Sequence, residues 1–218
     1  MILRKSIVLI LRGFTCVAFA VLTACASSQS AGPIIPDPLN FGSTQAALDE
    51  SRLIYERSDF NATLLDDLPD GLVTYSGYAY TISDSTDVDV ATEVSNDPLF
   101  AVGRATITAD FDSSAISGTA SNFIDGNNNQ VAGQLTLTAT VIPDFGQPRI
   151  TNSVIGQIAG QIGTASGGTF NYDTEVSGAV NGPNGEGVIV YAGDTVAIPD
   201  GSGVSVATPF VIGFVGHQ

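Results

Sequence analysis

The stretch from Arg104 to Val141 alternates apolar and polar residues in three consecutive runs, and this pattern most restricts how the chain can fold. In the first run, the apolar face carries Ala105, Ile107, Ala109 and Phe111. A period of two residues is typical of a β-strand with one buried face. Polar turns separate the three runs, so we expect three antiparallel strands of a β-meander.

The second and third runs add detail to this meander. Ile116, Gly118 and Ala120 share a face in the second run, but Phe123 is out of phase with them. A β-bulge or a twist near Ser121 and Asn122 would account for this change of phase, so we expect one of the two there. The third run places on one face Val131, Gly133, Leu135, Leu137, Ala139 and Val141.

Five further stretches have strand composition, and they bring the expected number of strands to eight. They cover residues 72–82, 150–162, 168–180, 187–198 and 207–215. Short, evenly spaced strands with glycine-rich corners favour an antiparallel barrel or sandwich, and closure into a barrel removes exposed edges. We therefore expect an all-β fold, an antiparallel up-and-down β-barrel of about eight strands. Its expected buried residues are Ile107, Phe111, Leu135, Leu137, Phe170 and Val176.

The N-terminus predicts the destination of the protein. Three cationic residues, Arg4, Lys5 and Arg12, precede a short apolar run that ends in Leu22-Thr23-Ala24-Cys25. This arrangement resembles a bacterial lipoprotein signal peptide, whose cysteine is acylated before cleavage just upstream. We expect lipid attachment at Cys25. The alternatives are a plain secretory peptide with an incidental Cys25, and a spanning helix, which Arg12 argues against.

The rest of the chain divides into three parts on composition. Residues 25–42 are rich in Ser, Gly and Pro and are expected to form a lipidated flexible tether. Residues 43–67 are expected to form a short helix over 43–57 and a linker. Ser43 provides an N-cap, and the apolar residues Ala47, Leu48, Ile54 and Tyr55 recur seven residues apart. Residues 68–218 are the expected barrel domain.

Charge and cysteine content exclude several classes of protein. Removing residues 1–24 takes away three of the seven Lys and Arg and none of the 22 Asp and Glu, so the net charge changes from −15 to −18. Such a surface repels nucleic acid and anionic lipid, although it also fits simple solubility in a salty exterior. Of the two cysteines, only Cys25 remains, so no intramolecular disulfide is expected.

Candidate catalytic and metal-binding groups are few. The turn from Asp125 to Asn129 has oxygen-bearing side chains at the spacing of a calcium loop, but Gln130 and Thr136 stand where that loop needs Gly and Glu, which favours a hairpin turn. An acidic cluster of Asp84, Asp87 and Asp89 suits a weakly bound cation or a solvated loop. His217 is the sole histidine, so we expect no metal, cofactor or catalytic residues and no enzymatic activity.

Four blocks resemble the barrel of transferrin-binding protein B and its small lipoprotein relatives. They are LPDGLVTYSGYA at 68–79, ITADFDSSAISGTASNF at 107–123, AGQLTLTATV at 132–141 and VSGAVNGPNGEGVIVYAG at 176–193. The chain departs from that pattern at Val180 and Asn181, where an aromatic residue usually precedes Gly-Pro. The resemblance implies an eight-stranded, lipid-anchored barrel on the outer membrane, in a family that binds host proteins or takes part in iron and haem uptake.

Two functions follow as expectations. In the first, the chain is a monomeric, surface-exposed outer-membrane lipoprotein whose barrel binds a protein, iron or haem ligand. In the second, it is a structural or assembly lipoprotein of the cell envelope without its own ligand. A binding barrel should present an aromatic or arginine-centred patch at one end. The candidates for such a patch are Arg149 beside Pro148 and the segment from Pro98 to Phe100. A barrel that spans the outer membrane is the main architectural rival.

Overall fold

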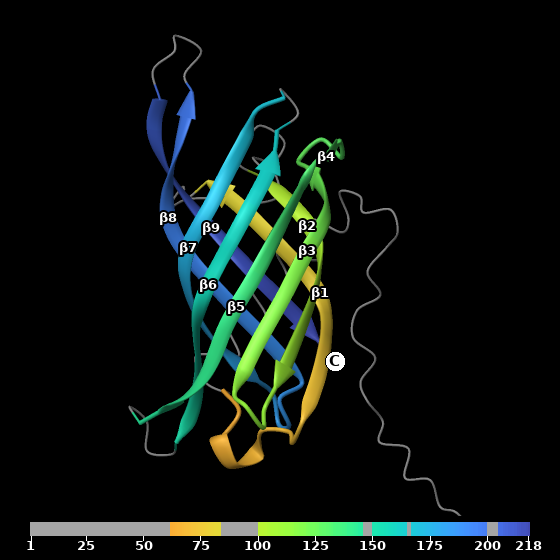
Figure 1. Cartoon of the computed structure of the whole chain (residues 1–218), viewed down its shortest axis with the longest axis vertical. Helices are drawn as coiled ribbons and strands as arrows, with labels where there is room; N and C mark the ends of the chain where they lie inside the picture. Colours follow the sequence, from red (N-terminus) through yellow and green to blue (C-terminus); the bar gives the residue numbers. More distant parts are fainter. Residues whose placement is uncertain (1–61, 84–99, 146–149, 165–166, 200–204) are drawn as a thin grey trace, which may run out of the picture.

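The strands form a single antiparallel sheet that closes on itself. The computed structural model describes residues 62–83, 100–145, 150–164, 167–199 and 205–218. Within these ranges the sheet has the strand order β2-β1-β9-β8-β7-β6-β5-β3-β4, and a β2–β3 pairing completes the ring (Figure 1). The strands are β1 (Leu72–Ser83), β2 (Ala101–Asp110), β3 (Ala115–Asp125), β4 (Gln130–Val131), β5 (Gly133–Asp144), β6 (Thr151–Gly163), β7 (Thr169–Asn181), β8 (Gly187–Pro199) and β9 (Ser205–His217).

This architecture confirms the all-β antiparallel barrel predicted from the alternating runs. Eight strands are long, and β4 is a two-residue extension at the β3–β5 turn. The helical content of the described ranges is one 3-10 turn, η1 (Leu65–Asp67), at the lower end of the barrel in Figure 1. The predicted tether over 25–42 and helix over 43–57 lie outside the described residues.

The barrel interior is filled with side chains from the inward face of each strand. Five of the six residues expected in the core are buried there, namely Ile107, Leu135, Leu137, Phe170 and Val176. The prediction was wrong for Phe111, which is only partly buried. Phe111 lies one residue beyond the end of β2, where its backbone N–H donates to the Gly71 carbonyl instead of continuing the strand.

The expected β-bulge lies in β3. The β2–β3 register shifts between Val102 and Arg104, and Asn122 takes a positive φ of 57°. The extra residue brings Phe123 back to the interior, where it is fully buried. Its ring lies against Gly103, at a place where a Cβ atom would stand only 2.6 Å from the ring. A glycine is therefore required opposite this bulge.

A second cluster of buried apolar side chains lies on the outside of the barrel. On β1, Tyr75 and Ala79 face the interior, so the alternate positions Tyr78 and Tyr80 face outward. We call this cluster the outer apolar band; it consists of Tyr78, Tyr80, Ile82, Phe100, Val102, Ile124, Ile189 and Val215, with Tyr191 and Val211 packed at its margin. It runs over the outer face of five neighbouring strands, β8, β9, β1, β2 and β3.

At the lower end in Figure 1, β6 and β7 diverge and a preceding segment fills the space between them. Their pairing ends at Val154 and Gly178. Below that point Thr63 N–H donates to the Val180 carbonyl and Leu65 N–H to the Ile150 carbonyl. The sheet therefore takes in residues 62–65, which the sequence analysis had assigned to a linker.

The buried side chain of Asn152 joins the two sides of this gap. Its Nδ2 donates to the carbonyls of Thr63 and Val180, each at 2.8 Å. Its Oδ1 accepts from Val180 N–H at 2.7 Å. One amide side chain thus satisfies three backbone groups that the diverging strands leave open, as buried polar groups require.

The pairing of β7 with β8 is also incomplete within the described residues. Both strands have 13 residues, but they pair only from Ser177 to Asn181 with Gly187 to Tyr191. Above that point β7 pairs with β6 and β8 pairs with β9. We call this region the β7–β8 seam. A side-chain hydrogen bond from Thr174 to Asp194, 3.4 Å long, crosses it.

Replacing Asn152 by alanine should destabilise the barrel by about 2 to 3 kcal/mol. The loss leaves Val180 N–H and the Thr63 carbonyl buried without this partner, and an unsatisfied buried group costs about 1 to 3 kcal/mol. Urea unfolding monitored by circular dichroism measures the change. Asn171→Ala, on the exposed face of β7, is the matched control and should unfold like wild type. Equal midpoints for Asn152→Ala and Asn171→Ala would contradict this role.

Candidate functional site

Four of the five large apolar side chains that are exposed on the described surface belong to the β5–β6 hairpin. Phe145 is 75 % exposed, Ile155 52 %, Ile150 47 % and Ile142 36 %. We call these four residues the hairpin tip. Thr140 pairs with Ile155 and Ile142 with Ser153, so Ile142 and Ile155 are diagonal neighbours on the outer face.

The hairpin tip extends beyond the neighbouring strands. The β3–β5 pairing ends at Ala115 and Thr140, while β5 continues to Asp144. In Figure 1 this end of the hairpin diverges from the rest of the barrel. A protruding segment with exposed apolar side chains is accessible to a partner without rearrangement of the fold.

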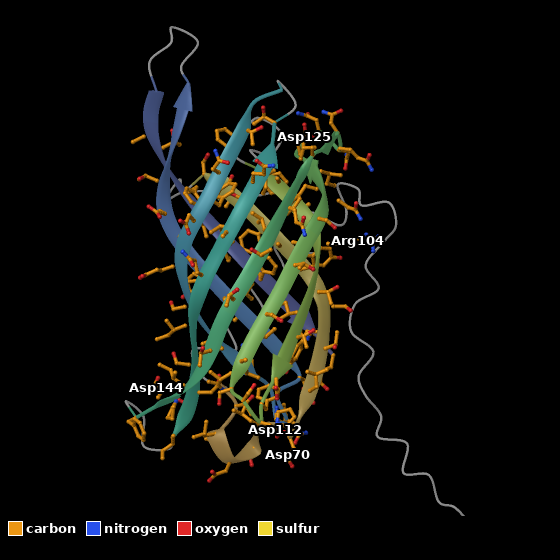
Figure 2. The ribbon with its side chains drawn as sticks, viewed as in Figure 1. Asp70, Arg104, Asp112, Asp125 and Asp144 are labelled. Atoms are coloured by element: carbon orange, nitrogen blue, oxygen red, sulfur yellow. The ribbon has the colours of Figure 1, made fainter. Side chains whose placement is uncertain are left out.

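Several carboxylates lie at the same end of the barrel as the hairpin tip. Asp70, Asp112 and Asp144 lie at this end in Figure 2, whereas Asp125 lies at the opposite end. The exposed Asp66 and Asp67 of η1 belong to the same end. This end of the barrel therefore combines an apolar protrusion at one side with several carboxylates.

One of the neighbouring carboxylates is held in its ionised form by the β2–β3 turn. Asp110 accepts from the Ser113 hydroxyl at 2.7 Å and from the backbone N–H groups of Ser113 and Asp112. The Ser113 hydroxyl is the main reason that the pKa of Asp110 is lowered, against an opposing effect of desolvation. The Asp110 carboxylate therefore stays ionised at a lower pH than an ordinary Asp side chain.

The base of the barrel under the tip is fixed by hydrogen bonds between distant segments. Tyr75 Oη donates to the Gly185 carbonyl at 2.8 Å, and Gln218 Nε2 donates to the same carbonyl at 2.9 Å. Burial raises the pKa of Tyr75 to about 12, with Gln218 acting in the opposite direction. These contacts join β1, the β7–β8 turn and the C-terminal residue, and they fix this part of the barrel end.

The turn from Asp125 to Asn129 has the hydrogen bonds of a hairpin turn. Asp125 Oδ1 accepts from the backbone N–H groups of Asn127 and Asn129, each at 2.8 Å, and Oδ2 accepts from Asn129 Nδ2 at 3.0 Å. Asn128 takes a positive φ of 63°, as turns of this kind require. The carboxylate thus stabilises its own turn, which is the interpretation that the sequence favoured over a calcium loop.

The other sequence candidates have separate positions. Phe100 is only 3 % exposed and belongs to the outer apolar band, so it is an ordinary strand end and not an exposed anchor. Arg149 lies outside the described residues, as do Cys25, Asp84, Asp87 and Asp89. His217 is the penultimate residue and pairs with Ser76 of β1.

Two searches of the described ranges found nothing. No three His, Cys, Asp or Glu side chains come together there as metal ligands. In the same ranges, no helix combines the length and the hydropathy needed to cross a bilayer.

The sequence analysis missed the hairpin tip, although one signal for it was present. Alternation along the third run continues to Val141, and Ile142 then places an apolar residue on the polar face. Phe145 follows three residues later, next to the segment that contains Arg149. Two apolar residues outside the alternating pattern at a strand end indicate an exposed patch.

Comparisons with known proteins gave limited similarity. No protein-family model and no curated protein matches the chain. Among solved structures, the chain is similar to a double mutant of the vaccine antigen transferrin-binding protein B from Haemophilus parasuis Hp5, with 20% identity, a TM-score of 0.37 and coverage of 72% of this chain and 28% of that one. A single mutant of the same antigen gives 20% identity, a TM-score of 0.36 and coverage of 72% and 29%. The chain thus spans under a third of the length of each.

Tyr75 should make the barrel unstable in alkali. Its phenol ionises near pH 10 in the unfolded chain and at about 12 in the folded one. Stability is unaffected below pH 10 and falls as the pH rises from there to 12, by about 3 kcal/mol in total. Unfolding in urea at a series of pH values measures this loss.

The control for this alkaline effect is Tyr75→Phe. It should cost about 1 kcal/mol at neutral pH, because one hydrogen bond to Gly185 is lost, and it should reduce the decline above pH 10. An identical decline in the variant would show that other groups cause it.

Proposed function

We propose that this chain is a non-enzymatic binding lipoprotein of the bacterial outer membrane, displayed at the cell surface, which contacts a protein partner through the hairpin tip. The single observation that carries the proposal is the exposed apolar protrusion, with Phe145 75 % exposed at its end. Exposed aromatic side chains on a fixed base are typical anchors of protein interfaces. A structural lipoprotein without its own ligand has no need of such a surface.

The sequence supports the cellular address in this proposal. The block Leu22-Thr23-Ala24-Cys25 follows a cationic start and a short apolar run, as in lipoprotein signals. The resemblance to small barrel lipoproteins found in four sequence blocks agrees with the same address. Iron-bearing or haem ligands follow from that resemblance alone, so we place them second to a protein partner.

The chemistry of the tip restricts the partner. An apolar protrusion fits an apolar hollow, and the carboxylates at the same end of the barrel favour a partner with cationic residues beside that hollow. Since the mature chain has a net charge of −18, association with such a partner should slow as ionic strength rises. Nucleic acids and anionic lipid surfaces do not fit this description.

Substituting the tip should abolish binding and leave the fold unchanged. Soluble residues 26–218 are immobilised and exposed to host-derived or growth-medium protein, and a haem titration is run in parallel. Phe145→Ser should weaken capture of any retained protein about 30-fold, the equivalent of about 2 kcal/mol for one central aromatic. Its thermal unfolding should match that of wild type, because the residue is exposed.

Leu72→Ser is the matched control for the tip, because Leu72 is 71 % exposed on β1 and is not part of it. This variant should bind like wild type. If Phe145→Ser and Leu72→Ser bind equally well, the tip is not the contact surface. If wild type retains neither protein nor haem, and a deletion strain has an envelope defect, the structural alternative is favoured.

Replacing Cys25 by serine should release the protein from the membrane. The hydroxyl cannot form the thioether that carries the lipid, so the chain loses its anchor. Fractionation of cells that express Cys25→Ser should give protein in the soluble fraction, whereas wild type sediments with membranes. Ser27→Ala controls for changes near the processing site. A Cys25→Ser chain that sediments like wild type would refute the lipid anchor.

A further inference from the structure

The outer apolar band faces away from the barrel and yet is closed off from solvent. Val102 and Val215 are 0 % exposed and Tyr78 is 1 % exposed. On the opposite wall, the outward-facing Ile155 is 52 % exposed. An outward-facing side chain on a sheet loses all contact with solvent only when a second layer covers it.

The strand register makes the band a continuous surface. Ile189 pairs with Val215, and Val215 pairs with Tyr78, so these three form one row across β8, β9 and β1. In the next row Gly213 lies between Tyr191 and Tyr80. A Cβ at Gly213 would stand 3.0 Å from the Tyr80 ring, so the glycine lets this ring lie flat on the sheet. A flat apolar surface of this kind suits a helix.

Within the described ranges, no helix or strand lies over the band, and the strands that carry it have their main contacts with one another. We propose that residues 43–57 of the same chain form an amphipathic helix that packs across the outer apolar band. The apolar stripe of Ala47, Leu48, Ile54 and Tyr55 is the face that meets the sheet.

The dimensions of the two surfaces agree. At 1.5 Å per residue, a helix over 43–57 is about 22 Å long. The band extends over five adjacent strands, and four spacings between them amount to about 19 Å. Tyr55, Leu48 and the tyrosines of the band also supply the large side chains that an interface between a helix and a sheet requires.

The chain joins the sheet at Ala62, and this position is close to the β8 edge of the outer apolar band. Ala62 forms a β-bridge with Asn181, and Asn181 pairs with Gly187 at the start of β8. Ile189, the first band residue of β8, follows two residues later. The four residues between Arg57 and Ala62 reach about 13 Å when extended, which is enough to bring the end of the helix to Ile189.

The segment between β1 and β2 fits the band less well. It brings five carboxylates, those of Asp84, Asp87, Asp89, Glu93 and Asp97. Burying ionised groups against an apolar wall is costly unless each is paired, and Arg104 is the only Lys or Arg in the described ranges. Residues 43–57 carry three acidic side chains: Asp49 and Glu56 lie on the face opposite the apolar stripe, and Glu50 lies at the margin of the stripe, one turn from Ile54.

Engineered cysteines test this packing directly. In residues 26–218, which contain no cysteine, Ile54→Cys is combined with Ile189→Cys in one protein and with Ile155→Cys in another. Mild oxidation should form an intramolecular disulfide in the first protein and not in the second, which carries its cysteine on the opposite wall. A disulfide in the second protein alone, or in neither, would overturn the proposal.

Charge substitutions supply a second readout. Leu48→Asp with Ile54→Asp should expose the band, which raises chemical nitration of Tyr78, Tyr80 and Tyr191 severalfold while the β-sheet circular dichroism persists. Gln45→Asp adds a single negative charge on the opposite helical face and should leave nitration at the wild-type level. Two outcomes would show that residues 43–57 do not cover the band. In the first, Val88→Asp with Val90→Asp raises the nitration of these tyrosines instead. In the second, wild type sediments as a dimer, and the tyrosines are protected from nitration only in the dimer.

Discussion

Backbone hydrogen bonding in a closed sheet is the constraint on which this structure depends. A barrel has no free edge, so each N–H and C=O of its wall needs a partner from a neighbouring strand or from a side chain. Where β6 and β7 diverge, Thr63 and Leu65 supply backbone partners and Asn152 supplies an amide. The Tyr75 and Gln218 contacts with Gly185 then fix the base. The hairpin tip lies where β5 continues past its pairing with β3 and has only β6 as a neighbour.

Much of the wall could be predicted from the sequence, because a sealed interior imposes apolar residues at every second position. Ile107, Leu135 and Leu137 follow that rule, and the phase error at Phe123 predicted the bulge that the β2–β3 register contains. Phe111 did not follow the rule, because the strand ends one residue before it. A strand end depends on where the neighbouring chain turns, and local alternation does not contain that information.

Contacts between distant segments explain the rest of what could not be predicted. Asn152 bonds to Thr63, 89 residues earlier, and nothing in the local sequence indicates that pairing. The outer apolar band also depends on distant segments. Tyr78 and Tyr80 alternate with small residues that face inward, which is the pattern of a strand. Which face of that strand is covered depends on the whole sheet. As candidate contact residues the sequence named Arg149 and Phe100 but missed Phe145, whose exposure depends on how far β5 extends beyond its pairing with β3.

The pairing of β1 with β9 determines when the barrel can be completed. Ser76 lies opposite His217, so an early strand needs the penultimate residue of the chain as its neighbour. Because synthesis proceeds from the N-terminus, β1 and its tyrosines emerge well before β9 exists. The ring therefore closes only after β9 has been made, and until then β1 has one side without its neighbouring strand. A chain built in this way depends on chaperones more than one whose neighbouring strands all follow one another in sequence.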